Sequence, residues 1–273
     1  MKPQIEKIET GCRKFLGSAQ TVTETFLNVK DAGEIKVLTI NARPYSVTGE
    51  NLSGEAEYNG KLGIKAIVAD ADGNVSGLSY TADFGGTFKN AAVSPDVRLD
   101  FAPFVVDLSY KTDGGVYVRC VVETRVYSEN RQCAEVLGGC DGVECLMKNV
   151  ETARLKASAD TSFAVSDEIE VKHRIGKILM AQSDAVISSA ECGDGLVKVK
   201  GCVYTCVTYQ AGENDIRSVM AETPFDEELP AEGCSSDCAV RAAAGGVNTR
   251  IRMENAAEGE NRTFTAELTE SVS

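Results

Sequence analysis

The sequence predicts an all-β protein made of two tandem antiparallel β-sandwich or barrel-like units, joined by a short irregular or helical linker. Three observations predict this class. Apolar and polar residues alternate over most of the 273 residues, Gly, Asn and Asp turns separate the alternating segments, and one stretch recurs at a fixed spacing. Alternation with period two gives a strand one buried face and one solvent face, which is typical of antiparallel sheets.

The recurrence aligns residues 50–84 without a gap on residues 191–225, a shift of 141 residues (191 − 50 = 141). Glycines in register indicate shared turns, and apolar residues in register indicate shared core faces. One domain design is therefore used twice, which favours a modular binding or assembly protein over an enzyme built around one unique site. The identical aligned pairs are Glu50 with Glu191, Gly54 with Gly195, Gly60 with Gly201 and Phe84 with Phe225.

The domain boundaries follow from where the alternation starts and stops. Residues 1–19 are expected to form an N-terminal arm, either a short helix or a free segment. Residues 20–132 carry the first β unit and residues 158–273 the second. Residues 133–157 break the strand pattern and are the linker, in which a helical spacing of apolar residues predicts a short helix. Those apolar residues are Val143, Leu146, Met147 and Val150.

Within the units, the clearest strands occur in chain order around residues 62–68, 116–126, 197–209 and 263–269. Acidic and glycine-containing turns adjoin the first three. Residues 70–74 follow the first strand, Asp113-Gly114-Gly115 precede the second, and residues 212–215 follow the third. The edge strands of such antiparallel units have free backbone N–H and C=O groups, so strand addition between neighbouring subunits is our hypothesis for assembly.

Composition and charge exclude several classes of function. The net charge of −13 repels nucleic acid and anionic membranes, so no nucleic-acid partner is expected. No apolar run approaches the roughly 20 residues needed to cross a bilayer, so no membrane span is expected. The N-terminus has charges throughout and no apolar core of a secretory signal, which predicts synthesis in the cytoplasm without a classical signal peptide.

Ten cysteines and a single histidine leave two interpretations open: reduced cysteines that act as small apolar residues, or disulfides within or between subunits of an assembly. Cys202 and Cys206 share one face of a strand but lie about 13 Å apart, too far to bond to each other. Cys202 and Cys206 form one candidate set with Cys234 and Cys238. The second candidate set lies in the linker region and consists of Cys133, Cys140 and Cys145. The candidate cross-linking residues are Cys133, Cys140, Cys145, Cys202, Cys206, Cys234 and Cys238.

Neither catalytic residues nor a cofactor or metal site are expected. The Cys-x3-Cys spacings lack the tight knuckles and histidines of zinc sites, and no phosphate-binding glycine loop occurs. A nucleophile needs a nearby base, and His173 lies where a turn is expected. Asp70 and Asp72 are expected at a solvated hairpin tip, with weak Ca²⁺ binding as the alternative.

The repeated unit resembles the SPOCS domain of SipL-type spore coat proteins of clostridia, a domain of unknown function. The resemblance rests on four recurring features: an apolar-x-Gly step, an alternating strand, an acidic or glycine turn, and an apolar strand that runs into a phenylalanine. In the first copy they occur at Tyr58-Asn59-Gly60, residues 62–68, 70–74 and 78–85; in the second, at Val199-Lys200-Gly201, residues 203–209, 212–215 and 219–228.

The resemblance implies two SPOCS-like copies over about three quarters of the chain. Many family members also carry a C-terminal LysM module, which this sequence lacks, so a short relative, a truncated chain or a self-assembling subunit is expected. The implied function is that of a non-enzymatic structural or adaptor protein in a bacterial spore envelope. Its implied partners are other coat or envelope proteins, or further copies of itself. The alternative is a module that binds a ligand or peptidoglycan fragment between the two units.

Overall fold

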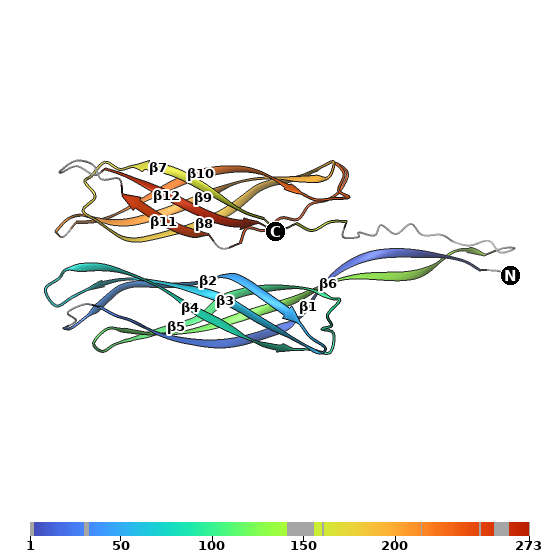
Figure 1. Ribbon diagram of the computed structural model, residues 1–273, viewed down its shortest axis with the longest axis horizontal. Coiled ribbons are helices and arrows are strands. Elements are labelled where there is room, and N and C mark those ends of the chain that lie inside the picture. The colour runs from blue at the N-terminus through green and yellow to red at the C-terminus, as the bar shows by residue number, and fades with distance from the viewer. Residues whose placement is uncertain are drawn as a thin grey trace.

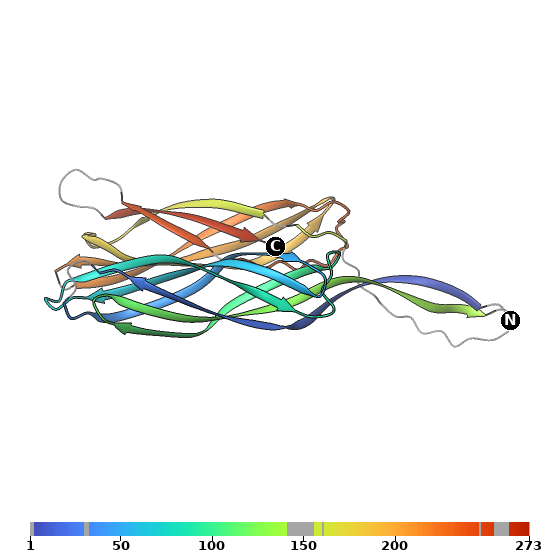
Figure 2. The same ribbon diagram turned by 60° about the horizontal axis from the view of Figure 1, so that its bottom comes forward.

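The computed structural model describes residues 3–29, 33–140, 156–159, 161–213, 215–245, 247–253 and 262–272, and these contain strands and turns but no helix. The strands build two elongated units that lie side by side with their long axes aligned (Figures 1 and 2). The predicted all-β fold of repeated antiparallel units is confirmed. The predicted helix around residues 143–150 lies outside the described residues.

The first unit is a sandwich of two three-stranded antiparallel sheets, with strand orders β1-β6-β5 and β2-β3-β4. The edge strand β1 contacts β4 of the other sheet, and β2 contacts β5, so the two sheets close into a flattened barrel. Its strands are β1 (Pro3–Leu27), β2 (Lys36–Asn51), β3 (Glu55–Ala69), β4 (Val75–Lys89), β5 (Arg98–Thr112) and β6 (Val116–Cys140).

The core of the first unit comes from the alternating residues of its two central strands. Every second residue of β3 and of the first half of β6 is buried, as period-two alternation requires. Each fully buried Val, Leu or Ile contributes roughly 1.5–3 kcal/mol relative to an exposed one. The largest fully buried side chains here are Tyr58, Leu62, Ile64, Val68, Val116, Val118, Val122 and Val126.

The second unit repeats this topology strand for strand, with sheet orders β7-β12-β11 and β8-β9-β10. Its core again lies between the sheets and includes Val203, Val207, Phe264 and Leu268. Its strands are β7 (Thr161–Glu170), β8 (Lys177–Gly193), β9 (Leu196–Gly212), β10 (Asp215–Pro230), β11 (Asn248–Met253) and β12 (Thr263–Val272).

The repeat extends to individual hydrogen bonds. The N–H of Gly54 donates to Val93 O at 3.0 Å, and 141 residues later the N–H of Gly195 donates to Cys234 O at 3.1 Å. Both glycines have positive φ, 80° and 75°, a conformation that other residues rarely adopt. The shared turn therefore explains why glycine occurs at both positions.

A second pair of glycines makes room for an aromatic ring. Gly60 pairs across the sheet with Phe84, and Gly201 pairs with Phe225. A Cβ at Gly60 would lie 2.5 Å from the Phe84 ring, and one at Gly201 would lie 2.3 Å from the Phe225 ring. Each phenyl ring thus lies across the backbone of its glycine partner, which only a residue without a side chain permits.

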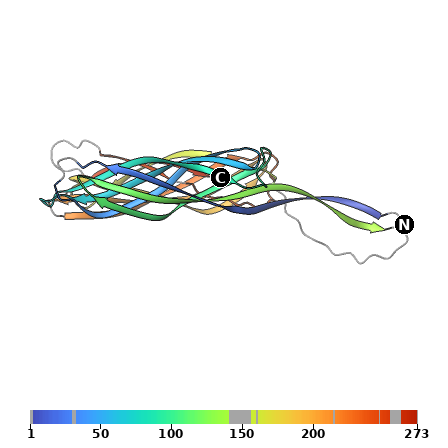
Figure 3. The ribbon, with the colours of Figure 1, turned by 90° about the horizontal axis from the view of Figure 1, so that it is seen from below.

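The structure corrects the expectations for residues 1–19 and for the start of the linker. β1 begins at Pro3 and β6 continues to Cys140, and the two pair antiparallel over this length. Residues 3–12 of β1 and 130–140 of β6 form a two-stranded ribbon that projects beyond the sandwich (Figure 3). Outside the sandwich neither face of the ribbon covers a core, so its sequence shows no clear alternation of apolar and polar residues.

We expect Thr124→Val to raise the free energy of unfolding by about 1 kcal/mol. Thr124 is fully buried on β6, and its hydroxyl has no hydrogen-bond partner in the described part of the chain. Valine keeps the shape and removes the cost of the unpaired hydroxyl. Chemical denaturation of both proteins measures the difference.

The matched control is Thr205→Val on β9, which is just as buried but whose hydroxyl lies 2.9 Å from Ser183 Oγ. That substitution removes a made hydrogen bond and should lower stability. Equal effects of the two substitutions would contradict this assignment of the hydroxyls.

Candidate interaction surfaces

The two units meet where the open edge of β8 lies on the outer face of the β2-β3-β4 sheet. An edge strand leaves alternate carbonyls without ladder partners, and these need other donors. Here the first unit supplies them from side chains. Lys65 Nζ donates to Ala181 O, and Arg43 Nη1 donates to Ser183 O at 3.4 Å. Arg43 also forms an ion pair with Asp184.

The approach of the strands at this contact is so close that one position tolerates no side chain. A Cβ on Gly77 of β4 would lie 1.8 Å from the carbonyl oxygen of Leu179 on β8. Nearby, Lys177 Nζ donates to Ser76 Oγ at 3.3 Å. Leu179, which lies at the contact, is buried. The backbone of β8 therefore packs directly on the face of the β2-β3-β4 sheet, and polar side chains around the contact hold it in place.

Burial at the contact between the units shifts the pKa of one of its lysines. Burial lowers the pKa of Lys65, and the neighbouring Arg43 guanidinium lowers it further. Two cations of the first unit thus face a row of carbonyls and one carboxylate of the second. The Arg43–Asp184 pair is largely exposed, so its own contribution is modest, whereas the hydrogen bonds to β8 carbonyls satisfy groups that the sheet leaves open.

The ribbon is the second surface, and its apolar residues face solvent. Ile5 and Leu137 lie opposite each other in register and are 57% and 58% exposed. In the described part of the chain no third strand pairs with the ribbon, so both of its edges are open. An isolated two-stranded hairpin is marginal in water, and an open edge is a template for pairing with another strand.

A cluster of aromatic and charged side chains anchors the ribbon where it leaves the sandwich. The Phe15 and Tyr127 rings lie 5.4 Å apart, and the Arg13 guanidinium lies 3.9 Å above the Tyr127 ring. Arg13 also pairs with Asp100 of β5. At the same point β1 has a bulge next to Gly17, whose φ is 146°. The bulge re-aims the strand, and the cluster fixes its direction.

The structure separates the cysteines that the sequence suggested as one set. Cys202 and Cys206 are half-buried on the outer face of β9. Their cross-strand neighbours are Pro224 and Val186 for the first, Met220 and Gln182 for the second, so neither lies opposite a cysteine. Cys133 is exposed and Cys140 half-buried, both on the ribbon strand β6, while Cys145 lies outside the described residues.

Cys234 and Cys238 instead lie beside Cys192, which sequence reasoning did not select. Both Cys234 and Cys238 lie close enough to Cys192 to raise its pKa. Cys192 is the penultimate residue of β8, close to the turn at Gly195, and the Gly195 N–H donates to Cys234 O. The equivalent bond in the first unit joins Gly54 to Val93, 141 residues earlier. The repeat spacing is therefore the sequence signal that could have placed Cys192 near Cys234.

The acidic turn after β3 uses its carboxylate to shape the hairpin. Asp70 accepts the N–H groups of Asp72 and Asn74 at 3.0 and 2.8 Å, and the Asn74 side-chain amide at 2.9 Å. These bonds, chiefly that from the Asn74 side chain, lower the pKa of Asp70.

His173 is exposed between β7 and β8. Among the described residues, no group of three or more acidic, histidine or cysteine side chains is arranged to hold a metal ion.

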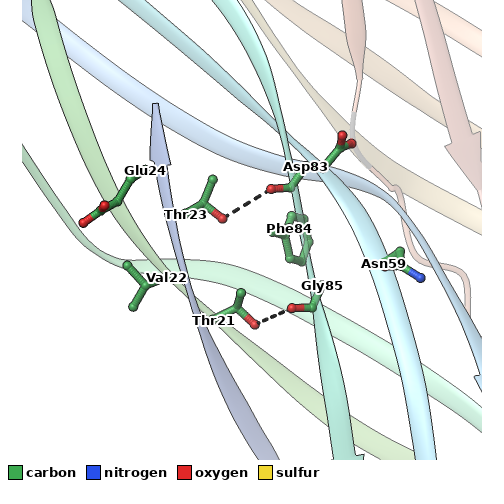
Figure 4. Close-up of a pocket in the computed structure, with 8 residues that line it drawn as sticks. All are labelled: Thr21, Val22, Thr23, Glu24, Asn59, Asp83, Phe84 and Gly85. Atoms are coloured by element: carbon green, nitrogen blue, oxygen red, sulfur yellow. Dashed lines mark hydrogen bonds between the residues drawn. The ribbon is translucent and has the colours of Figure 1, made fainter. Parts of the chain in front are cut away.

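A depression of about 480 Å³ lies on the first unit, at the seam between β1 and β4 (Figure 4). Two threonines of β1 bridge the seam: Thr21 Oγ1 donates to Gly85 O at 3.1 Å, and Thr23 Oγ1 to Asp83 O at 3.4 Å. These hydroxyls replace the ladder that the two edge strands lack. The depression therefore lies within one unit, not in a groove between the two.

Comparison with known proteins identifies one region. Residues 174–256 match the family model described as SipL, SPOCS domain, and this span contains β8, β9, β10 and β11. No curated protein and no solved structure matches the chain. In the part of the chain that the structure describes, no helix has the length and apolarity needed to traverse a membrane.

Gly77→Val is expected to separate the two units, because its side chain would occupy the position of the Leu179 carbonyl. Each unit should stay folded, since Gly77 faces away from the core of its own sheet. Small-angle X-ray scattering would show a larger radius of gyration with unchanged circular dichroism. Ser79→Val, exposed on the same face of β4, is the control and should leave the scattering curve unchanged.

Asp70→Ala is expected to destabilise the protein at neutral pH and to lose this effect in acid. A carboxyl whose folded pKa is below its unfolded value of about 3.9 stabilises the fold above that value. The contribution disappears as the pH falls through the folded pKa. Melting temperatures of variant and wild type should therefore converge below about pH 4. An Asp72→Ala control should show a smaller effect, and a gap that stays constant with pH would contradict the role of Asp70.

Proposed function

We propose, on the premise that residues 174–256 form a SPOCS domain, that this chain is a structural or adaptor protein of a bacterial spore envelope. In this proposal it acts through protein–protein contacts and catalyses no reaction. The SPOCS match associates the chain with sporulation. The first unit, which has the same strand order and the same 141-residue register, would be a second copy of that domain.

The observation that carries the proposal is the ribbon. It extends the two longest described strands away from the sandwich (Figure 1). No other described strand pairs with its edges, and it carries an exposed apolar pair, Ile5 and Leu137. Such an arm gains backbone hydrogen bonds and apolar burial by adding to the sheet of a neighbouring subunit. A second copy of this chain is the occupant we propose, because its ribbon carries the same apolar pair and the same strand edges that no described strand covers.

The depression at the β1–β4 seam supports a ligand-binding module less well. Two of its hydroxyls, those of Thr21 and Thr23, already bond to backbone carbonyls of β4. Its two carboxylates form exposed ion pairs, Glu24 with Arg119 and Asp83 with Lys61. Few unpaired polar groups converge there, whereas specific small-molecule sites depend on such groups.

The test measures self-association of the full chain. Size-exclusion chromatography with light scattering gives the molar mass over a range of protein concentrations. Ile5→Lys combined with Leu137→Lys should weaken association at least tenfold. Each side chain loses roughly 1.5–3 kcal/mol of apolar burial, and 1.4 kcal/mol corresponds to a factor of ten. Both residues lie outside the core, so the fold should remain intact.

Met220→Lys is the matched control. Met220 is 67% exposed on β10, more than either ribbon residue, but it lies away from the ribbon. Its replacement should leave association unchanged. A wild-type protein that stays monomeric at all concentrations, with and without reductant, would contradict self-assembly through the ribbon.

A further inference from the structure

Three cysteines converge at one end of the second unit. Cys192 is the penultimate residue of β8, and Cys234 and Cys238 lie in the loop that follows β10. Cys192 lies near enough to the Cys234 and Cys238 thiols for both to affect its pKa. The bond from the Gly195 N–H to Cys234 O, 3.1 Å long, fastens the loop to the β8–β9 turn. The backbone therefore holds these thiols together.

The first unit shows that this neighbourhood belongs to the fold. The positions 141 residues earlier are Asn51, Val93 and Val97. Asn51 Nδ2 donates to Val97 O, so the end of β2 reaches the same loop that the end of β8 reaches. In the first unit a side-chain hydrogen bond fastens the loop. In the second unit cysteine occupies all three equivalent positions, and the Asn51 bond has no counterpart.

The pKa values of Cys238 and Cys192 are shifted in opposite directions. The backbone N–H of Ser235 is the main cause that lowers the pKa of Cys238. The Ser235 hydroxyl oxygen lies 3.6 Å from the Cys238 sulfur and donates its proton to Asp237. Burial, and then the contact with Cys234, raises the pKa of Cys192. The thiolate is the nucleophile in disulfide exchange, so the lowered pKa favours Cys238 over Cys192 as the thiol that reacts first.

We propose that Cys192 and Cys234 form an intramolecular disulfide, and that Cys238 is the entry point for the oxidant, a low-molecular-weight disulfide. The Cys238 thiolate attacks that disulfide and releases one small thiolate. Cys192 attacks the mixed disulfide at the Cys238 sulfur and releases the second. Cys234 then attacks Cys192 and restores the Cys238 thiolate. Two protein thiols are oxidised and one small disulfide is reduced to two thiols. The two protons that the protein thiols lose end on the two small thiols.

The bond would close a loop that contains β9 and β10, the central and one edge strand of the matched SPOCS region. A crosslink over a loop of this length restricts the unfolded chain and stabilises the fold. It would also replace the loop fastening that Asn51 provides in the first unit. The inference does not depend on the proposed assembly role, because the disulfide forms within one chain.

The experiment exposes the full reduced chain to oxidised glutathione and maps disulfides by mass spectrometry after non-reducing digestion. The expected product in wild type joins Cys192 to Cys234, with a melting temperature several degrees above that of the reduced protein. Cys192→Ser should abolish both. Cys238→Ser should give the same disulfide several-fold more slowly. Cys202→Ser and Cys206→Ser, on the outer face of β9, should behave as wild type.

Three outcomes would overturn the inference. The first is a wild-type protein in which Cys192 stays reduced after all other accessible thiols have reacted. The second is a dominant crosslink between chains through Cys238. The third is an unchanged rate in Cys238→Ser, which would remove its role as the entry point. The melting temperature of each reduced variant shows that loss of the disulfide does not come from a failure to fold.

Discussion

In the part of the chain that the structure describes, every sheet has three strands, so two strands of every sheet are edges whose backbone groups need partners. The rest of the structure depends on how those edges are covered. In the first unit the edges of the two sheets cover each other, β1 against β4 and β2 against β5. Threonine hydroxyls bridge one of these seams. At the edge of β8, the first unit itself supplies the donors, Lys65 and Arg43.

The ribbon is where this covering stops. Beyond the last pairing between β5 and β6, the strands β1 and β6 continue with only each other as partners among the described residues. The same physical requirement that closes the sandwich therefore leaves its extension open. Proteins usually blunt such edges to prevent association, and an exposed apolar pair does the opposite. This contrast is why the ribbon, and not the seam depression, supports the proposed role in assembly.

The sequence predicted the elements whose side chains separate into a buried and an exposed face. Residues 62–68 and 116–126 lie in the central strands β3 and β6, where alternation is strongest. The turn glycines Gly54 and Gly195 were also predictable, because positive φ restricts residue choice. The ribbon was missed because it has no core-facing side. The Cys192–Cys234 neighbourhood was missed because the spacing between two cysteines says little about which loop packs on which hairpin.

One ion pair in the contact between the units joins positions that are equivalent in the two copies. Arg43 and Asp184, which form an ion pair there, are 141 residues apart, the length of the repeat itself. In a symmetric dimer of separate identical chains, a residue next to the twofold axis meets its own copy, so arginine would face arginine. Joining the two copies in one chain allowed the equivalent positions to take opposite charges. This contact therefore has an attractive ion pair at equivalent positions, where two identical chains would carry like charges.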